Sequence, residues 1–365
     1  MKKNVSLLIV TFMLISCLIP LTACGSTTGN LEHNSNQITL NDASTSTTNL
    51  DTPSNQENKD DPNGSVPSLT PSEGLEYILS EDETFYIVRG IGTCTDTTLV
   101  IPSTHNELPV KEIYNANSYM DGAFYLQKQL TDVIIPESIT SIGKHSFLAC
   151  DNLKTIVIGK NVVSIEDDAF RLCSNLTNII VDENNNTYKV IDGNLYTKDA
   201  TKLVQYAVGK PDIAFTIPQS VKSIGYGAFS GCRNLQKVEI PNTVTSIGYR
   251  AFSSCSNLQN ITVPNSVTEI KNGIFAECSN LKTAIIGNGI DTISAQMFAS
   301  CYSLESIEIK NNIFSIGPRA FEQCENLKNI YYIGTIEEWN NIEKHSEGND
   351  RLSIISITCS DGIIE

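Results

Sequence analysis

Cysteine is the residue type whose spacing in this chain first suggests chemistry. Seven cysteines recur in register with a phenylalanine that returns every 23 residues, at Cys150, Cys173, Cys232, Cys255, Cys278, Cys301 and Cys324. Thiols at a fixed interval could form disulfides, bind a metal ion, or act as small buried side chains. The elements that hold them decide between these three chemistries.

If the repeats stack as coils, neither disulfides nor metal binding fits well. Equivalent Cβ atoms of neighbouring coils would lie about 4.8 Å apart, beyond the usual disulfide span of roughly 3.5–4.5 Å. Structural zinc sites usually take two ligands from a short C-x₂₋₄-C unit, and the sequence has none. The four histidines also fall outside the register of the cysteines. We therefore expect a ladder of buried free thiols, with no metal and no other cofactor.

The positioning elements follow from a repeat of the form L-x-x-I-x-I-P-x-x-V-x-x-I-G-x-x-A-F-x-x-C. Val238 and Ile240 alternate with Lys237 and Glu239, which predicts a strand with one buried face, and Pro241 ends it. V-x-x-I predicts a second short strand or turn, and A-F-x-x-C a tight helical turn. Because such coils bury their apolar faces on one another, the sequence predicts a parallel solenoid of about nine coils.

These motifs resemble the BspA-type leucine-rich repeats of bacterial surface proteins. Residues 74–113 resemble the N-terminal cap of that family, residues 114–334 its repeats and residues 335–365 its C-terminal cap. The segment "YKVIDGNLYTKDATKLVQYAVGKPD", within an insertion at about residues 182–212, resembles one often found between its repeats. The resemblance implies a leucine-rich-repeat solenoid, capped at both ends, that binds partners at a cell surface and does not catalyse a reaction.

The N-terminus predicts membrane attachment. Residues 1–23 read as a lipoprotein signal peptide, and "LTAC" looks like a lipobox that would place a diacylglycerol on Cys24. An ordinary signal peptide cleaved near Ala23 is the alternative. Residues 24–73 are rich in Ser, Thr, Asn and Asp, which predicts a disordered stalk. We expect a protein on the extracellular face of a bacterial cell membrane, held there by its lipid alone.

Charge and motifs exclude several classes of function. The net charge of −16 disfavours nucleic acid as a partner. The sequence has no G-x-S-x-G, no H-E-x-x-H and no plausible Cys–His pair, so we expect no enzyme. Asp167 and Asp168 form a carboxylate pair, expected on an exposed turn. A compact pocket with converging titratable groups near Tyr188, Asp192 and Tyr196 would favour an enzyme.

The outward faces of the strands offer the candidate partner surface. The register predicts a polar first column, at Asp132, Thr155, Asn178, Lys237, Asn260, Thr283, Ser306 and Asn329. The second column begins with three apolar residues, Ile134, Val157 and Ile180, which we predict to form an exposed partner-binding stripe. The alternatives are that these β-branched side chains only pair between strands, or that the insertion covers them.

The function predicted from the sequence is therefore non-catalytic binding. A surface lipoprotein of this kind would bind a protein or a glycan, in adhesion or in interaction with a host or neighbouring cell. The alternative function is a passive structural or scaffold protein of the cell envelope. Trp339, the single tryptophan, is expected to close the C-terminal end of the core.

Overall fold

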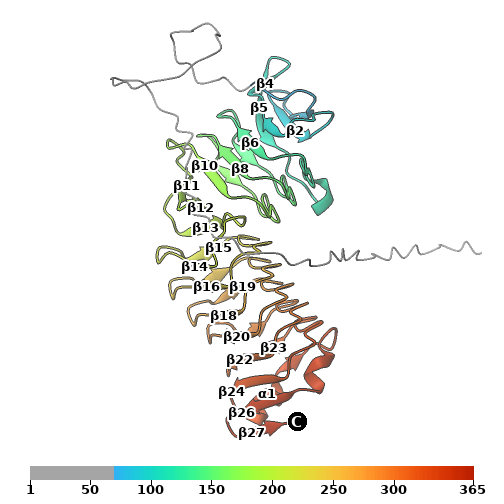
Figure 1. Ribbon diagram of the computed structural model, residues 1–365, viewed down its shortest axis with the longest axis vertical. Coiled ribbons are helices and arrows are strands. Elements are labelled where there is room, and N and C mark those ends of the chain that lie inside the picture. Colours follow the sequence, from blue (N-terminus) through green and yellow to red (C-terminus); the bar gives the residue numbers. More distant parts are fainter. Residues whose placement is uncertain (1–69) are drawn as a thin grey trace, which may run out of the picture. The chain divides into compact units, whose positions relative to one another are not determined.

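The computed structural model describes residues 70–365 of the chain, which lie in one compact unit. This unit is a parallel β-solenoid of about 12 turns with repeats of about 23 residues (Figure 1), which confirms the predicted fold. The repeats alone predict nine turns. The number is higher because the caps continue the coil: β3 pairs in parallel with the first repeat and β26 with the last.

Each turn contributes one strand to one of two sheets, which we together call the main sheet, and β27 adds an antiparallel strand at its C-terminal edge. Its N-terminal part has four strands in the order β10-β8-β6-β3, with the bounds Asn178–Val181, Thr155–Ile158, Asp132–Ile135 and Thr98–Val100. Its C-terminal part has eight strands, β14 (Ala214–Thr216), β16 (Lys237–Glu239), β18 (Asn260–Val263), β20 (Thr283–Ile286), β22 (Ser306–Lys310), β24 (Asn329–Ile333), β26 (Ser356–Cys359) and β27 (Gly362–Ile364). Buried and outward residues alternate along these strands, as the sequence predicts.

The V-x-x-I segment of each repeat forms a second short strand, as predicted, and these strands belong to three sheets that we together call the second sheet. These strands are β7 (Ser141–Ile142), β9 (Ser164–Ile165), β15 (Ser223–Ile224), β17 (Ser246–Ile247), β19 (Glu269–Ile270), β21 (Thr292–Ile293) and β23 (Ser315–Ile316). A tight turn follows, in which the amide of Cys255 donates to the carbonyl of Phe252 at 3.2 Å. Each coil thus presents two strands and one turn side.

The repeated phenylalanines and cysteines fill the core beneath the turns. Rings of neighbouring coils stack with centroids 4.7 to 5.8 Å apart. The nine cysteines of the described residues are buried free thiols, which confirms the predicted ladder. Six of them donate to the phenylalanine carbonyl of the preceding coil, as Cys255 Sγ does to Phe229 at 3.2 Å. A small side chain with a weak donor suits this slot.

The insertion divides the core in two. It forms β11 (Tyr188–Ile191), β12 (Asn194–Thr197) and β13 (Lys202–Gln205), of which β11 and β12 pair antiparallel and β13 continues the second sheet. Both faces of β12 are buried: Leu195 packs in the N-terminal core and Tyr196 in the C-terminal core. The insertion is therefore an internal wall of the solenoid.

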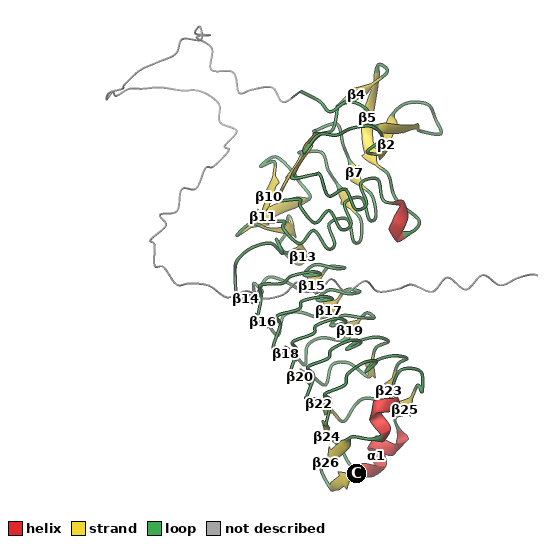
Figure 2. Ribbon diagram, turned by 45° about the vertical axis from the view of Figure 1, so that its right-hand side comes forward, coloured by secondary structure: helices red, strands yellow, loops and turns green. Residues whose placement is uncertain are grey.

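Both ends of the solenoid are closed. The N-terminal cap contains β1 (Glu76–Leu79), β2 (Tyr86–Gly90), β4 (Thr104–His105), β5 (Leu108–Ile113) and the 3₁₀ turn η1 (Tyr119–Asp121). At the other end, helix α1 (Ile336–Asn341) has a capping box between Thr335 and Glu338. Figure 2 shows α1 beside the last strands. Trp339 is buried and meets Tyr332 edge-on at 5.4 Å, as expected of a residue that closes the core.

Candidate functional site

The three residues predicted as a partner stripe lie in one row across the four-stranded sheet. Ile134 pairs with Val157, and Val157 pairs with Ile180. Val100 of the N-terminal cap extends the row by one strand, and we call these four residues the outward row. Sequence reasoning missed Val100 because it lies outside the 23-residue repeat.

The outward row is half-buried, so it is less exposed than the sequence predicts. Its β-branched side chains cover one another, because neighbours on one face of a sheet stand about 5 Å apart. The equivalent column of the eight-stranded sheet is mixed, with Glu239, Thr262, Ile285, Glu308 and Tyr331. A continuous apolar row is thus confined to the N-terminal part of the main sheet.

A second feature arises where one coil is short. Leu203 pairs with Ile224, and Tyr206 stacks on Phe229 at 5.0 Å, so this coil keeps its core positions. Only two residues separate Leu203 from Tyr206, whereas residues 225–228 separate Ile224 from Phe229. The short coil lacks a full turn, and the turns on either side of it flank a hollow that we call the notch.

The notch has a volume of about 440 Å³. It is lined by Ala116, Asn117, Ser118, Tyr119, Lys144, His145, Asp167, Asp168, Tyr226 and Tyr249. A second hollow, of about 330 Å³, is lined by Tyr119 as well and includes Arg171 and Arg250. Segments from five different coils therefore bring charged and aromatic side chains together.

Asp168 lies at the centre of this cluster and is buried, with 5% of its side chain exposed. The expectation that it lies on an exposed turn is wrong, because Arg171 and the turn of the next full coil pack over it. Its Oδ2 lies 3.8 Å from His145 Nε2 and 3.9 Å from Arg171 Nη1. These separations allow attraction between charges but are too long for hydrogen bonds.

Burial sets the ionisation of the cluster. It raises the pKa of Asp168, although Arg171 and His145 oppose this shift. Burial also lowers the pKa of His145, against the influence of Asp168. His145 is therefore predominantly neutral at pH 7.

Gly227 makes room for the Asp168 side chain. Its φ is +57°, a conformation that glycine adopts without strain. A Cβ at this position would lie 2.7 Å from Asp168 Oδ1. His145, Asp168 and Arg250 occupy the equivalent left-handed position of their own coils, so the repeat places these three side chains on the same side of the solenoid.

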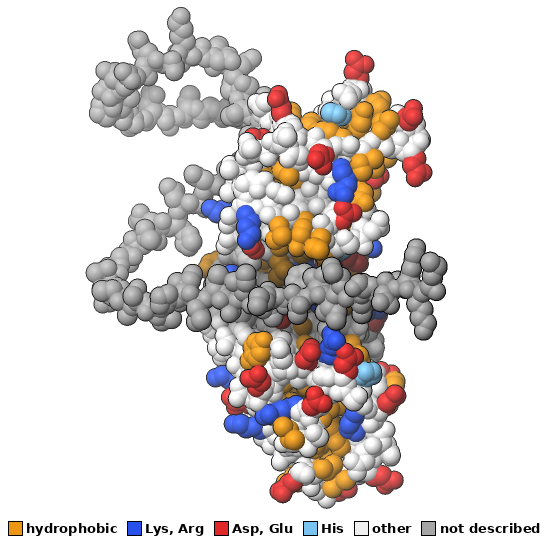
Figure 3. Space-filling model, turned by 90° about the vertical axis from the view of Figure 1, so that its right-hand side faces the viewer, with side chains coloured by type: hydrophobic (Ala, Val, Ile, Leu, Met, Phe, Trp, Pro, Cys, Tyr) orange, Lys and Arg blue, Asp and Glu red, His pale blue; other side chains and the backbone are white. Residues whose placement is uncertain are grey.

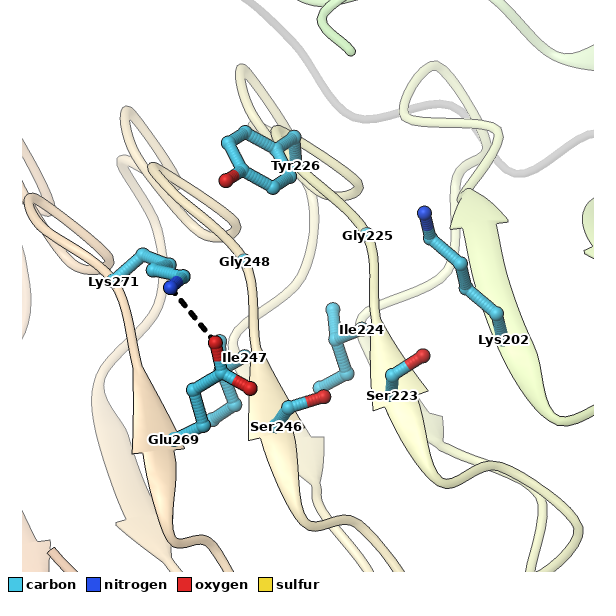
Figure 4. A pocket seen from close by; sticks show the side chains of 10 residues that line it. All are labelled: Lys202, Ser223, Ile224, Gly225, Tyr226, Ser246, Ile247, Gly248, Glu269 and Lys271. Atoms are coloured by element: carbon cyan, nitrogen blue, oxygen red, sulfur yellow. Dashed lines mark ion pairs between the residues drawn. The ribbon is translucent and has the colours of Figure 1, made fainter. Parts of the chain in front are cut away.

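A polar groove adjoins the notch on the second sheet. Lys202, Ser223, Ser246 and Glu269 lie in register on β13, β15, β17 and β19. Figure 4 shows this row beneath Tyr226, with Lys271 paired to Glu269 at 2.7 Å. Tyr226 also lines the notch, so the notch and the groove, of about 150 Å³, share one wall.

The remaining predictions concern the tyrosines of the insertion, the N-terminus, metal binding and a membrane span. Tyr188 and Tyr196 are buried core residues, and the hydroxyl of Tyr188 accepts a hydrogen bond from the amide of Ile165. Cys24 lies outside the described residues, as do the predicted signal peptide and nearly all of the predicted stalk. Within residues 70–365, no group of three potential ligands is placed to hold a metal ion. The same residues include no helix with the length and hydropathy of a membrane span.

On the face shown in Figure 3, acidic and basic side chains are interspersed with small hydrophobic groups. The excess of acidic residues in the whole chain therefore does not form a broad patch of one sign on this face. Recognition there would depend on local groups of side chains more than on long-range attraction.

The repeats and caps define a leucine-rich-repeat solenoid. The pattern of the BspA type leucine rich repeat region matches residues 112–199 and 213–340 in six copies, and the chain belongs to this family. Folds of this type serve protein interaction and are typically non-enzymatic.

Solved structures similar to the chain include bacterial leucine-rich-repeat proteins. A leucine-rich repeat protein from Eubacterium ventriosum is 22% identical, with 79% of this chain and 91% of that chain covered and a TM-score of 0.48. A leucine rich cell surface protein from Faecalibacterium prausnitzii is 24% identical, with 77% and 99% covered and a TM-score of 0.48. No curated protein matches the chain.

Proposed function

We propose that this chain is a lipid-anchored protein of the extracellular face of a bacterial membrane, and that its solenoid binds a protein partner without catalysis. The anchor is Cys24. The observation that carries the binding proposal is the outward row, in which Val100, Ile134, Val157 and Ile180 stand side by side on four paired strands.

The outward row has the composition of the centre of an interface. Four strands about 4.8 Å apart place its ends roughly 14 Å from each other. The polar side chains of Asp132, Thr155 and Asn178 run parallel to it on the same face. An apolar centre with a polar rim is the usual anatomy of a protein–protein interface.

The partner that fits this surface is a protein with an apolar ridge. A row of uncharged β-branched side chains offers contact area and no hydrogen-bonding groups, so it suits an apolar protein surface better than a glycan. Attachment to a host or neighbouring cell follows if the partner is carried by that cell. A scaffold protein of the envelope would need no such partner.

A binding screen tests the proposal. Residues 74–365 would be presented to immobilised matrix proteins, mucins and envelope extracts, together with the triple variant I134K/V157K/I180K. The matched control, T262K/I285K/Y331K, places lysines at equivalent exposed positions of the eight-stranded sheet. We expect saturable binding that the first variant loses and the control keeps. Equal binding by both variants would remove the outward row from the proposal, and no binding at all would favour the scaffold.

A further inference from the structure

The notch combines three features that nothing in the repeat pattern requires. It is a hollow of about 440 Å³, it has tyrosines on several sides, and it contains buried polar atoms without partners. We propose that the notch binds a sugar residue of a glycan, at a site separate from the outward row. The following observations identify a saccharide as the ligand class.

Three polar atoms around the notch lack a hydrogen-bond partner among the described residues. They are Nδ1 of His145 and Oδ1 of Asp168, which line the notch, and Nε of Arg250, which lines the second hollow. An unpartnered buried polar group costs about 1–3 kcal/mol of desolvation, so their convergence at one place calls for an explanation. Asp168 Oδ1 accepts and Arg250 Nε donates, and the hydroxyl groups of one sugar ring do both.

The tyrosines supply the apolar side of such a site. Tyr119 is 46% exposed and lies 4.6 Å from the His145 ring, measured between centroids. The rings of Tyr226 and Tyr249, from neighbouring coils, have centroids 6.4 Å apart. A sugar ring has C–H faces that pack on aromatic rings, while its hydroxyl groups reach the charged side chains at the edge. A small number of polar groups set among aromatic walls is typical of ligand pockets.

The charges of the notch argue against a simple ion as the ligand. Arg171 and Asp168 offset each other, and Lys144 and Asp167 add one charge of each sign to the lining. A cation would meet Lys144, with Arg171 and Arg250 in the second hollow, and an anion would meet Asp167 and Asp168. A neutral ligand with many hydroxyl groups satisfies donors and acceptors together.

The adjoining groove offers polar groups to further residues of a bound saccharide. Beyond Tyr226, the row of Lys202, Ser223, Ser246 and Glu269 offers hydroxyl, amino and carboxylate groups in register. These side chains bond readily to sugar hydroxyl groups. The structure therefore points to an oligosaccharide with its terminal residue in the notch and its next residues along the groove.

The experiment measures binding of the full chain, in detergent, to an array of oligosaccharides ending in galactose, N-acetylglucosamine, mannose, fucose or glucose. Calorimetry then gives the Kd for any oligosaccharide bound. We expect at least tenfold weaker binding for Tyr119→Ala, Tyr249→Ala and Asp168→Asn. Tyr302→Ala is the matched control, because Tyr302 is 44% exposed but lies outside the notch.

Folding and the other site are controlled separately. Tyr119 is largely on the surface, so Y119A keeps the fold even if D168N does not, and circular dichroism checks each variant. The variant I134K/V157K/I180K should bind oligosaccharide normally, and Y119A should keep any protein partner of the outward row. No binding on the array would overturn the proposal, as would binding that Y119A and Y249A both retain.

Discussion

Phe275 lies between Phe252 and Phe298, with ring centroids 5.5 and 5.6 Å away. Truncation to alanine leaves a cavity that the neighbouring coils cannot fill, so F275A should lower the free energy of unfolding by roughly 3–5 kcal/mol. Phe314 is 59% exposed, and F314A should change the free energy of unfolding by less than about 0.5 kcal/mol. Urea unfolding of both variants measures the difference. Equal losses would contradict the packing described for the phenylalanine column.

The buried thiols predict a pH dependence of stability. Burial raises the pKa of Cys150 and of Cys324 to about 12, whereas an unfolded thiol ionises near pH 8.5. The contribution of each neutral buried thiol to the free energy of unfolding is therefore complete below about pH 8.5, and it falls as the pH rises toward 12. Each such thiol lowers the free energy of unfolding by about 1.4 kcal/mol per pH unit in this range. Cys150→Ala should show a shallower decline between pH 8 and 10.5, and an identical slope would contradict the assignment.

For single residues, the sequence predicted the repeated phenylalanines and cysteines of the core but missed the notch. The 23-residue register places eight phenylalanines and seven cysteines, because packing in a solenoid repeats with the sequence. The burial of Asp168 depends on the short coil, which breaks that register. Two signals pointed to the notch: the reduced spacing between Leu203 and Tyr206, and the tyrosines at 226 and 249, one repeat apart. Neither signal shows which side chains converge.

The insertion is the element whose role was hardest to predict. A segment that interrupts a repeat suggests a wall outside the sheet, but β12 is buried on both faces. Its short apolar run gives no period from which a two-sided strand could be recognised. The repeats themselves, with clear two-residue alternation, were predicted well.

The two sides of β12 should therefore be separable. Leu195→Ala should raise amide hydrogen exchange in the N-terminal core, and Tyr196→Ala in the C-terminal core, because each residue packs in one core only. Each variant is the control of the other, and mass spectrometry locates the change. Because each coil of a solenoid contacts only its neighbours, the rise in hydrogen exchange should weaken with each coil away from the substitution. Uniform loosening by either variant would mean that the two cores behave as one.

For the whole molecule, the caps and the repeats form one continuous solenoid whose turns differ in what they present. The outward row belongs to the four-stranded sheet, and the notch belongs to the turn side next to the insertion. The family and the fold follow from the sequence pattern. The partner surface rests on side chains that the pattern leaves free to vary, so it needs a binding experiment.

The most direct test of the proposed surface function is attachment by a bacterium that displays the full chain. Cells of a non-adherent strain would carry equal amounts of the wild type, I134K/V157K/I180K or T262K/I285K/Y331K, and attachment to mucin-coated and epithelial surfaces would be counted. We predict that the wild type and the second variant attach to at least one surface, and that the first variant attaches at least tenfold less. Attachment by all three proteins alike, or by none, would contradict the claim that the outward row holds a surface partner.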